Sequence, residues 1–88
     1  MPEFKVFFTE KARKDLSDLP EHETDKILSS CIRLESNPHP DGKHIKKLKG
    51  YKDMYRLRIG DYRAIFEWKS NTVTVVRLLT KQDFGKRY

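Results

Sequence analysis

A two-residue break, Gly60-Asp61, divides an otherwise continuous run of alternating apolar and polar residues between Met54 and Trp68. Glycine followed by aspartate has the composition of a type II′ turn, the tight turn that joins neighbouring antiparallel strands. With this turn, Ile59 pairs with Tyr62, and every other cross-strand pair follows from the strand period of two residues. The sequence therefore predicts a β-hairpin with a fixed register.

The alternation also assigns a side of the sheet to each residue of this hairpin. One side carries the apolar set that should pack against helices, namely Tyr55, Leu57, Ile59, Tyr62, Ala64, Phe66 and Trp68. The other side carries Arg56, Arg58 and Arg63, and we expect the helices to leave that side open. A register shifted by one residue would bury these arginines, which argues against the shift.

Arg58 and Arg63 stand directly opposite each other in this register, and Arg56 lies two residues away on the same side. Like charges directly across a ladder are destabilising, so we expect an anion to bind this surface. Guanidinium groups present forked donors that match phosphate, which makes phosphate the favoured ligand. The competing interpretation is a surface pair neutralised by Glu67 or by an acidic partner protein.

The rest of the chain supplies one strand and two helices before the hairpin and one strand after it. Thr9 suits the N-cap of the first helix, Pro20 ends that helix, and the breaker cluster over 37–42 indicates a loop. The predicted elements are a strand over 4–8, helices over 10–19 and about 21–36, a short strand or extended edge over 44–49, strands over 54–59, 62–68 and 72–79, and a basic tail over 80–88. This order predicts a single α+β domain over residues 1–88. An N-terminal strand and a two-helix hairpin precede a three-stranded antiparallel meander, and the helices pack on one face of the sheet.

The composition limits the classes of protein and site that the chain can form. Its 88 residues make one small domain, 36% hydrophobic and 36% charged. No apolar run approaches the roughly 20 residues that span a bilayer, and no signal-peptide core follows Met1. Cys31 is the only cysteine, and no two histidines or carboxylates show metal-ligand spacing. We therefore expect a cytoplasmic protein without a disulfide, a metal or a membrane contact.

The net charge of +6 is concentrated in one segment. Residues 43–63 hold eight basic and two acidic side chains, and the rest of the chain is balanced. A localised basic surface on a neutral body is typical of a nucleic-acid-binding protein. The lysines of this segment that we assign to RNA binding are Lys46, Lys47, Lys49 and Lys52. Solubility, an acidic protein partner and anionic lipid are the competing explanations of the charge.

Two neighbouring motifs resemble the RelE/ParE toxin superfamily. They are Lys47-Leu48-Lys49-Gly50 and the segment Tyr55-Arg56-Leu57-Arg58-Ile59-Gly60-Asp61-Tyr62-Arg63-Ala64-Ile65-Phe66. The predicted order of elements matches as well, so the resemblance covers nearly the whole chain. It implies a small basic α+β toxin that is encoded beside a cognate antitoxin. RelE-like members cleave messenger RNA in the ribosomal A site, whereas ParE-like members inhibit DNA gyrase.

The RelE branch of the resemblance implies endoribonuclease chemistry without a metal or cofactor. The RNA 2′-hydroxyl attacks the adjacent phosphate, and basic side chains stabilise the developing charge. On this resemblance Arg56 and Arg58 match the basic pair of the first meander strand, and Arg63 matches the arginine after the hairpin. Lys81 falls near the basic residue that follows the last strand, and Tyr88 stands for a C-terminal tyrosine that stacks at the scissile base. The implied partners are the antitoxin, the ribosome and messenger RNA.

Two departures from the family pattern affect the predicted chemistry. Thr80-Lys81 occupies the place of a His-Arg pair, and arginine replaces lysine at the paired positions of some active members. Arginine stays protonated, so it cannot act as a general base. The candidates for that role are His44, Lys49, Lys52, Lys81 and Tyr88. A gyrase inhibitor without nuclease activity and a degenerate, non-toxic relative therefore remain alternatives.

Overall fold

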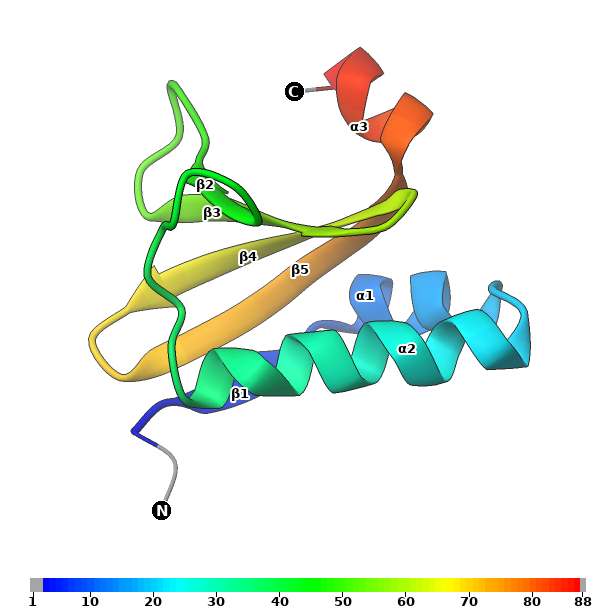
Figure 1. Ribbon diagram of the computed structural model, residues 1–88, viewed down its shortest axis with the longest axis horizontal. Coiled ribbons are helices and arrows are strands. Elements are labelled where there is room, and N and C mark those ends of the chain that lie inside the picture. The colour runs from blue at the N-terminus through cyan, green and yellow to red at the C-terminus, as the bar shows by residue number, and fades with distance from the viewer. Residues whose placement is uncertain (1–2, 88) are drawn as a thin grey trace.

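The computed structural model describes residues 3–87 and forms a five-stranded sheet with helices α1 and α2 on one face (Figure 1). The strand order is β1-β5-β4-β3-β2, in which β1 runs parallel to β5 and the other neighbours are antiparallel. The elements are β1 (Lys5–Phe8), α1 (Glu10–Ser17), α2 (Glu21–Ile32), the 3₁₀ turn η1 (Arg33–Glu35), β2 (Ile45–Lys47), β3 (Met54–Ile59), β4 (Tyr62–Lys69), β5 (Thr72–Thr80) and α3 (Lys81–Arg87). The predicted α+β class and order of elements are confirmed.

The hairpin of β3 and β4 has the register that the turn predicted. Ile59 pairs with Tyr62, and Arg58 pairs with Arg63. Gly60 has a φ of +57°, whereas Asp61 is not among the residues with positive φ. This is the pattern of a type II′ turn, in which the first central position needs a positive φ that glycine adopts without strain.

The main core lies between the sheet and the two helices. Ala12 and Leu16 of α1 and Ile27 and Cys31 of α2 are buried against the predicted apolar side of the hairpin. The Thr9 hydroxyl accepts a hydrogen bond from the Ala12 amide and so caps α1 as expected.

Two helix boundaries differ from the prediction. The first helix ends at Ser17 rather than at residue 19, and Pro20 occupies the N-cap position of α2. The second helix ends at Ile32, and the next three residues tighten into the 3₁₀ turn η1. Tightening of the last helical turn is common where the chain must leave a helix, and here it places Leu34 in the core.

The second face of the sheet is not fully open, which corrects the expectation. A smaller cluster covers part of it, formed by Leu48, Ile65 and Leu79 with Met54, Val76 and Phe84 packed against them. Phe84 comes from α3, a helix that was predicted only as a tail and that stands on this face (Figure 1). Burial of apolar side chains favours folding the tail back onto the sheet.

Candidate functional site

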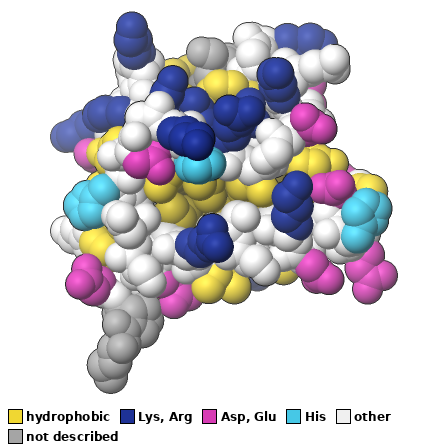
Figure 2. All heavy atoms as spheres, in the orientation of Figure 1, with side chains coloured by type: hydrophobic (Ala, Val, Ile, Leu, Met, Phe, Trp, Pro, Cys, Tyr) yellow, Lys and Arg dark blue, Asp and Glu magenta, His cyan; other side chains and the backbone are white. Residues whose placement is uncertain are grey.

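The three arginines of the hairpin share one face of the sheet but differ in exposure. Arg58 is exposed, Arg56 is half-buried, and Arg63 is only 8% exposed. Basic side chains gather on the side of the molecule that holds β2 and β3 (Figure 2). No carboxylate of residues 3–87 forms an ion pair with these arginines, so the charges of Arg58 and Arg56 are available to a ligand.

Arg63 is bound to the turn of its own hairpin. Its Nη1 donates hydrogen bonds of 2.9 Å to the carbonyl oxygens of both Gly60 and Tyr62. A buried guanidinium with two such bonds braces the backbone that carries Arg58. Of the two arginines that the sequence assigned to anion binding, Arg58 is therefore the more accessible to a ligand.

Arg56 completes the arginine group and lies against the loop that precedes β2. Its Nη1 donates to the His44 carbonyl at 3.3 Å, and the Arg58 amide donates to the same oxygen at 2.8 Å. Burial lowers the pKa of Arg56, and the positive charges of Arg63 and Arg58 lower it further. Arginine remains protonated despite such a shift, so this group can bind and stabilise an anion but cannot take a proton.

The four lysines assigned to RNA binding do not share one surface. Lys46 pairs with Arg56 across the β2–β3 ladder and extends the arginine face. Lys47 pairs with Tyr55 and faces the other side, where its Nζ donates to the Tyr51 carbonyl at 3.0 Å and lies 5.7 Å from the Tyr55 ring centroid. The remaining two, Lys49 and Lys52, are exposed in the loop between β2 and β3.

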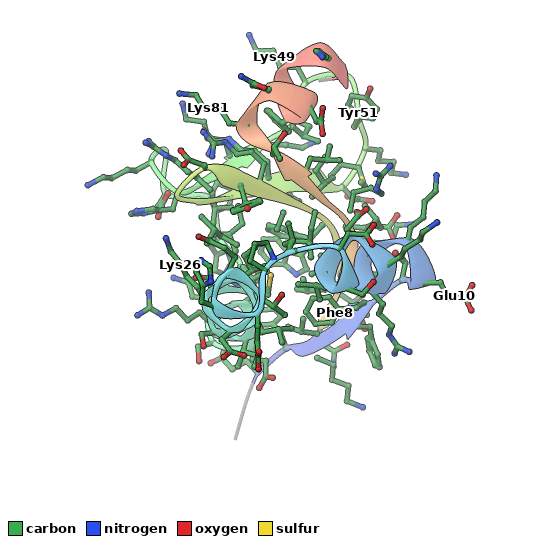
Figure 3. All side chains as sticks on the ribbon, turned by 90° about the vertical axis from the view of Figure 1, so that its right-hand side faces the viewer. Phe8, Glu10, Lys26, Lys49, Tyr51 and Lys81 are labelled. Atoms are coloured by element: carbon green, nitrogen blue, oxygen red, sulfur yellow. The ribbon has the colours of Figure 1, made fainter. Side chains whose placement is uncertain are left out.

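The last two predicted catalytic residues fall at the C-terminal end. Lys81 is the exposed first residue of α3, and its amide donates to the Asp61 carbonyl at 2.7 Å, which brings it beside the hairpin turn (Figure 3). Tyr88 lies outside the described residues. His44 is exposed, and its Nδ1 lies 3.6 Å from the Asp41 carboxylate.

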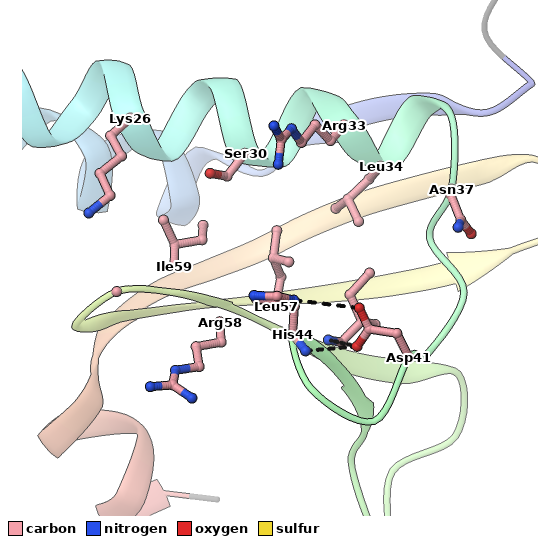
Figure 4. A pocket seen from close by; sticks show the side chains of 12 residues that line it. Lys26, Ser30, Arg33, Leu34, Asn37, Asp41, His44, Leu57, Arg58 and Ile59 are labelled. Carbon is pink, nitrogen blue, oxygen red and sulfur yellow. Dashed lines mark hydrogen bonds and ion pairs between the residues drawn. The ribbon is translucent and has the colours of Figure 1, made fainter.

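A hollow of about 500 Å³ lies between α2 and the strands β3 and β2, and the sequence alone did not predict it (Figure 4). Lys26, Ser30 and Arg33 line it from the α2 side, and Arg58 and His44 line it from the sheet side. The signal in the sequence was the spacing of Lys26, Ser30 and Arg33, because residues four and seven positions apart share a helix face. Lys26 and Arg33 lie in the part of the chain whose charges balance, so the charge distribution did not indicate a site there.

Asp41 organises the loop at one end of this hollow. Its Oδ1 accepts hydrogen bonds from the backbone amides of Lys43, His44 and Ile45 at 2.9, 2.7 and 3.0 Å. The amide bonds from Ile45 and Lys43 are the main reason that the pKa of Asp41 lies well below its usual range. The Asp41 carboxylate therefore stabilises the backbone conformation of its own loop.

Within residues 3–87, the structure gives no support for a cysteine nucleophile, a metal site or a membrane-spanning helix. Cys31 is fully buried, and burial raises the pKa of its thiol to about 12, which suits a core residue and not a nucleophile. Within the described part of the chain, no group of three or more His, Cys, Asp or Glu side chains is placed to hold a metal ion. None of the described helices is both long and apolar enough to cross a bilayer.

Residues 6–83 match the family model described as the ParE toxin of the type II toxin-antitoxin system parDE. The chain belongs to the RelE/ParE toxin superfamily. Toxin RelE3 of Methanocaldococcus jannaschii is 37% identical over 83 residues, which cover 90% of this chain and 92% of that relative. The function that the superfamily shares is that of a toxin in a type II toxin–antitoxin system.

Solved structures of the superfamily share the fold. A chain of the RelB-RelE antitoxin-toxin complex from Methanococcus jannaschii matches with a TM-score of 0.76 and 32% identity, covering 94% of this chain and 99% of its own length. The archaeal RelE-RelB complex from Pyrococcus horikoshii OT3 contains a chain that matches with a TM-score of 0.74 and 31% identity, covering 90% and 96%. A chain of the ParDE system from P. aeruginosa matches with a TM-score of 0.69 at 14% identity, a likeness of fold alone.

Proposed function

We propose that this toxin inhibits translation as a metal-independent endoribonuclease that cleaves messenger RNA on the ribosome, and that a cognate antitoxin neutralises it. The observation that carries the proposal is the exposed Arg58 beside Arg56, with no carboxylate of residues 3–87 paired to either. Preorganised donors of this kind stabilise the charge that develops on a phosphate under attack. The RelE proteins of the two archaeal complexes, which resemble this chain, are paired with RelB.

The arginines divide the work in this proposal. Arg58 contacts the scissile phosphate, Arg56 assists it from the same strand, and Arg63 holds the hairpin turn that presents Arg58. Lys46 extends the surface along the RNA backbone from its place opposite Arg56. Lys81 lies beside the hairpin turn and supplies a further positive charge at that end of the hairpin.

The proton of the attacking 2′-hydroxyl needs an acceptor that is not an arginine. His44 is the candidate that we favour, because its backbone stands opposite Arg58 and because a neutral imidazole has a ring nitrogen that can accept a proton. RNA that is held in a fixed conformation by the ribosome also places the 2′-hydroxyl in line with the leaving oxygen. A weak base is then sufficient, which agrees with a site in which arginines replace lysines.

Induced expression in a permissive host tests the proposal. The wild-type chain should arrest protein synthesis and produce RNA ends that map within codons, and Arg58→Ala should abolish both effects. Lys69→Glu, which changes an exposed lysine at the far end of β4, is the matched control and should remain toxic. Arrest of growth with intact transcripts would refute the nuclease role.

Inhibition of gyrase is the second candidate function, and the match to the ParE family model favours it. The basic surface would then bind an acidic protein surface instead of RNA. Plasmid supercoiling in the same cultures separates the two functions. Relaxed plasmids with intact messenger RNA support the gyrase inhibitor, and a harmless wild-type chain indicates a degenerate relative.

A further inference from the structure

Tyr51 presents an aromatic ring to solvent in the loop between β2 and β3. The residue is 43% exposed, and Phe7, at 53%, is the only other phenylalanine, tyrosine or tryptophan among residues 3–87 that is exposed. Phe7 belongs to β1, which lies at the opposite edge of the sheet from β2. Within the described part of the chain, Tyr51 is therefore the single exposed aromatic side chain at the edge that carries the basic strands β2 and β3.

This loop stands on the sheet face that carries the hairpin arginines. Leu48 and Met54, at its two ends, pack in the small cluster that covers part of that face. Figure 1 shows the loop on the same side of the sheet as α3, and Figure 3 places Tyr51 on that side, away from α1 and α2. Arg56 and Arg58 follow Met54 after two and four residues, which is about 7 and 13 Å along a strand. A nucleic-acid strand bound to the arginines therefore has this ring within reach of its neighbouring nucleotides.

The backbone that carries the ring is held in one conformation. Gly50 and Asp53 have φ values of +81° and +58° and turn the chain on either side of the loop tip. The Lys47 Nζ donates a hydrogen bond of 3.0 Å to the Tyr51 carbonyl oxygen, and the Trp68 amide donates one of 2.9 Å to the Asp53 carbonyl oxygen. A side chain on an ordered backbone loses less conformational entropy when it binds a ligand, so more of its contact energy contributes to affinity. The loop is therefore suited to present the Tyr51 ring as a fixed platform.

The charges around the ring favour nucleic acid as its ligand. Lys49 and Lys52 are exposed on either side of Tyr51 in the chain, and neither forms an ion pair within residues 3–87. Proteins that bind single-stranded nucleic acid combine such charges with aromatic rings, because phosphates pair with the cations while bases stack on the rings. An acidic protein surface would neutralise the two lysines as well, but the hairpin arginines continue the positive charge along the sheet, which matches the regular charges of a polynucleotide.

We propose that Tyr51 is a base-stacking residue of the RNA-binding surface. A base of the single-stranded messenger RNA stacks on its ring, and Lys49 and Lys52 bind the phosphates on either side of that base. The strand is then held at two points, at the ring and at Arg58, which limits its rotation over the site. Every base has a π-face, so the contact contributes affinity and position without selecting a base. The inference deepens the proposed function and rests on the RNA-binding part of it.

The test measures binding of the full-length chain to an unstructured RNA of about 20 nucleotides with 2′-O-methyl sugars, by fluorescence anisotropy over a range of salt concentrations. Tyr51→Leu keeps an apolar side chain but removes the ring, and should weaken binding by about tenfold or more while the salt dependence is unchanged. Tyr51→Phe keeps the ring and should bind within about twofold of wild type. Phe7→Leu makes the matched change at the other exposed aromatic residue, and its affinity should equal that of wild type.

The two lysines give a second measurement that separates charge from stacking. Lys49→Gln/Lys52→Gln should reduce the slope of log affinity against log salt by about 1.4, which is about 0.7 for each phosphate contact to a single strand. An unchanged slope overturns the assignment of the flanking phosphates to these lysines. A reduced slope in Tyr51→Leu would show that this substitution disturbs the charges of the loop, and overturns the stacking role.

The outcomes also separate this inference from the proposed function. Equal affinity of Tyr51→Leu and wild type overturns the stacking residue, and equal weakening in Tyr51→Phe or in Phe7→Leu does so as well. Stacking at Tyr51 in a chain that leaves cellular transcripts intact refutes the nuclease role and leaves this inference standing. A wild-type chain that does not bind the RNA overturns the inference, while the mapped RNA ends still decide the nuclease role. Loss of antitoxin binding in Tyr51→Leu, with RNA affinity retained, assigns the ring to a protein partner instead.

Discussion

Arg58 and Arg63 face each other across the β3–β4 ladder, yet one is exposed and the other is buried with its Nη1 bonded to the hairpin turn. The repulsion between like charges is reduced because the Gly60 and Tyr62 carbonyl dipoles solvate the buried guanidinium. The pair is therefore asymmetric. Arg63 supports the turn, and Arg58 presents its charge to a ligand.

This asymmetry predicts different effects for substitutions of the two arginines. Arg58→Ala removes an exposed group and should change the free energy of unfolding by less than about 0.5 kcal/mol while toxicity is lost. Arg63→Met keeps most of the side-chain volume but leaves two carbonyls without their donor, and should cost about 1–3 kcal/mol. Urea denaturation and growth assays on both variants provide the measurements. Equal stability of Arg63→Met and wild type would show that the bonds to the turn contribute nothing.

The contact between α1 and β5 is expected to be the main polar support of the helix layer. The Asp15 Oδ2 accepts hydrogen bonds of 2.9 Å from the Arg77 Nε and from the Leu78 amide, and the two charged side chains are 19% and 20% exposed. Asp15→Ala removes these two bonds and a third from the Arg77 Nη2 to the Asp15 Oδ1, and should destabilise the fold by about 2–4 kcal/mol. Asp18→Ala, an exposed change at the end of the same helix, should stay within about 0.5 kcal/mol in the same denaturation experiment.

The loop that bears His44 should depend on pH through Asp41. Amide hydrogen bonds lower the pKa of Asp41 in the folded state relative to about 3.9 in the unfolded chain. The carboxylate therefore stabilises the fold fully above that unfolded pKa, and this contribution is lost as the pH falls through the lower folded pKa. Asp41→Asn should lower the Tm at pH 7, and the difference from wild type should shrink at pH values below about 3.9. A constant difference in Tm from pH 7 to pH 2.5 would exclude this origin.

Cys31 should be inert in the native protein. It is fully buried in the main core, and burial raises its thiol pKa to about 12, so the thiolate is scarce at pH 8. A disulfide-exchange reagent should react with the wild type only as fast as the protein opens, and at the ordinary rate in guanidinium. Rapid labelling under native conditions would mean that α2 separates readily from the sheet.

Phe84 is predicted to hold α3 against the second face of the sheet. It packs on the small cluster of Leu48, Ile65 and Leu79. Because the side chain is only partly buried, Phe84→Ala should cost about 1–2 kcal/mol, less than a fully buried phenylalanine. Amide exchange in residues 81–86 should accelerate in this variant, whereas exchange in α2 should be unchanged.

The sequence was sufficient for the sheet register because local chemistry determines it. The Gly60-Asp61 turn permits one pairing, and alternation then sorts every residue of β3 and β4 between two faces. Thr9 and the strand periods located most of the remaining elements for the same reason. The tail over 80–88 gave no such signal, because a short helix with one partly buried aromatic side chain is stable only in contact with the sheet.

What the sequence by itself determined is the fold class, the pairing of Arg58 with Arg63 and their common face. Only the tertiary structure decided that Arg63 is buried, that Lys47 faces away from the arginines and that Lys26 and Arg33 join Arg58 around a hollow. Side-chain alternation and turn preferences depend on residues that are close together along the chain, so they can be predicted from the sequence. Exposure and the meeting of α2 with the sheet edge depend on how whole elements pack, and no local pattern encodes that geometry.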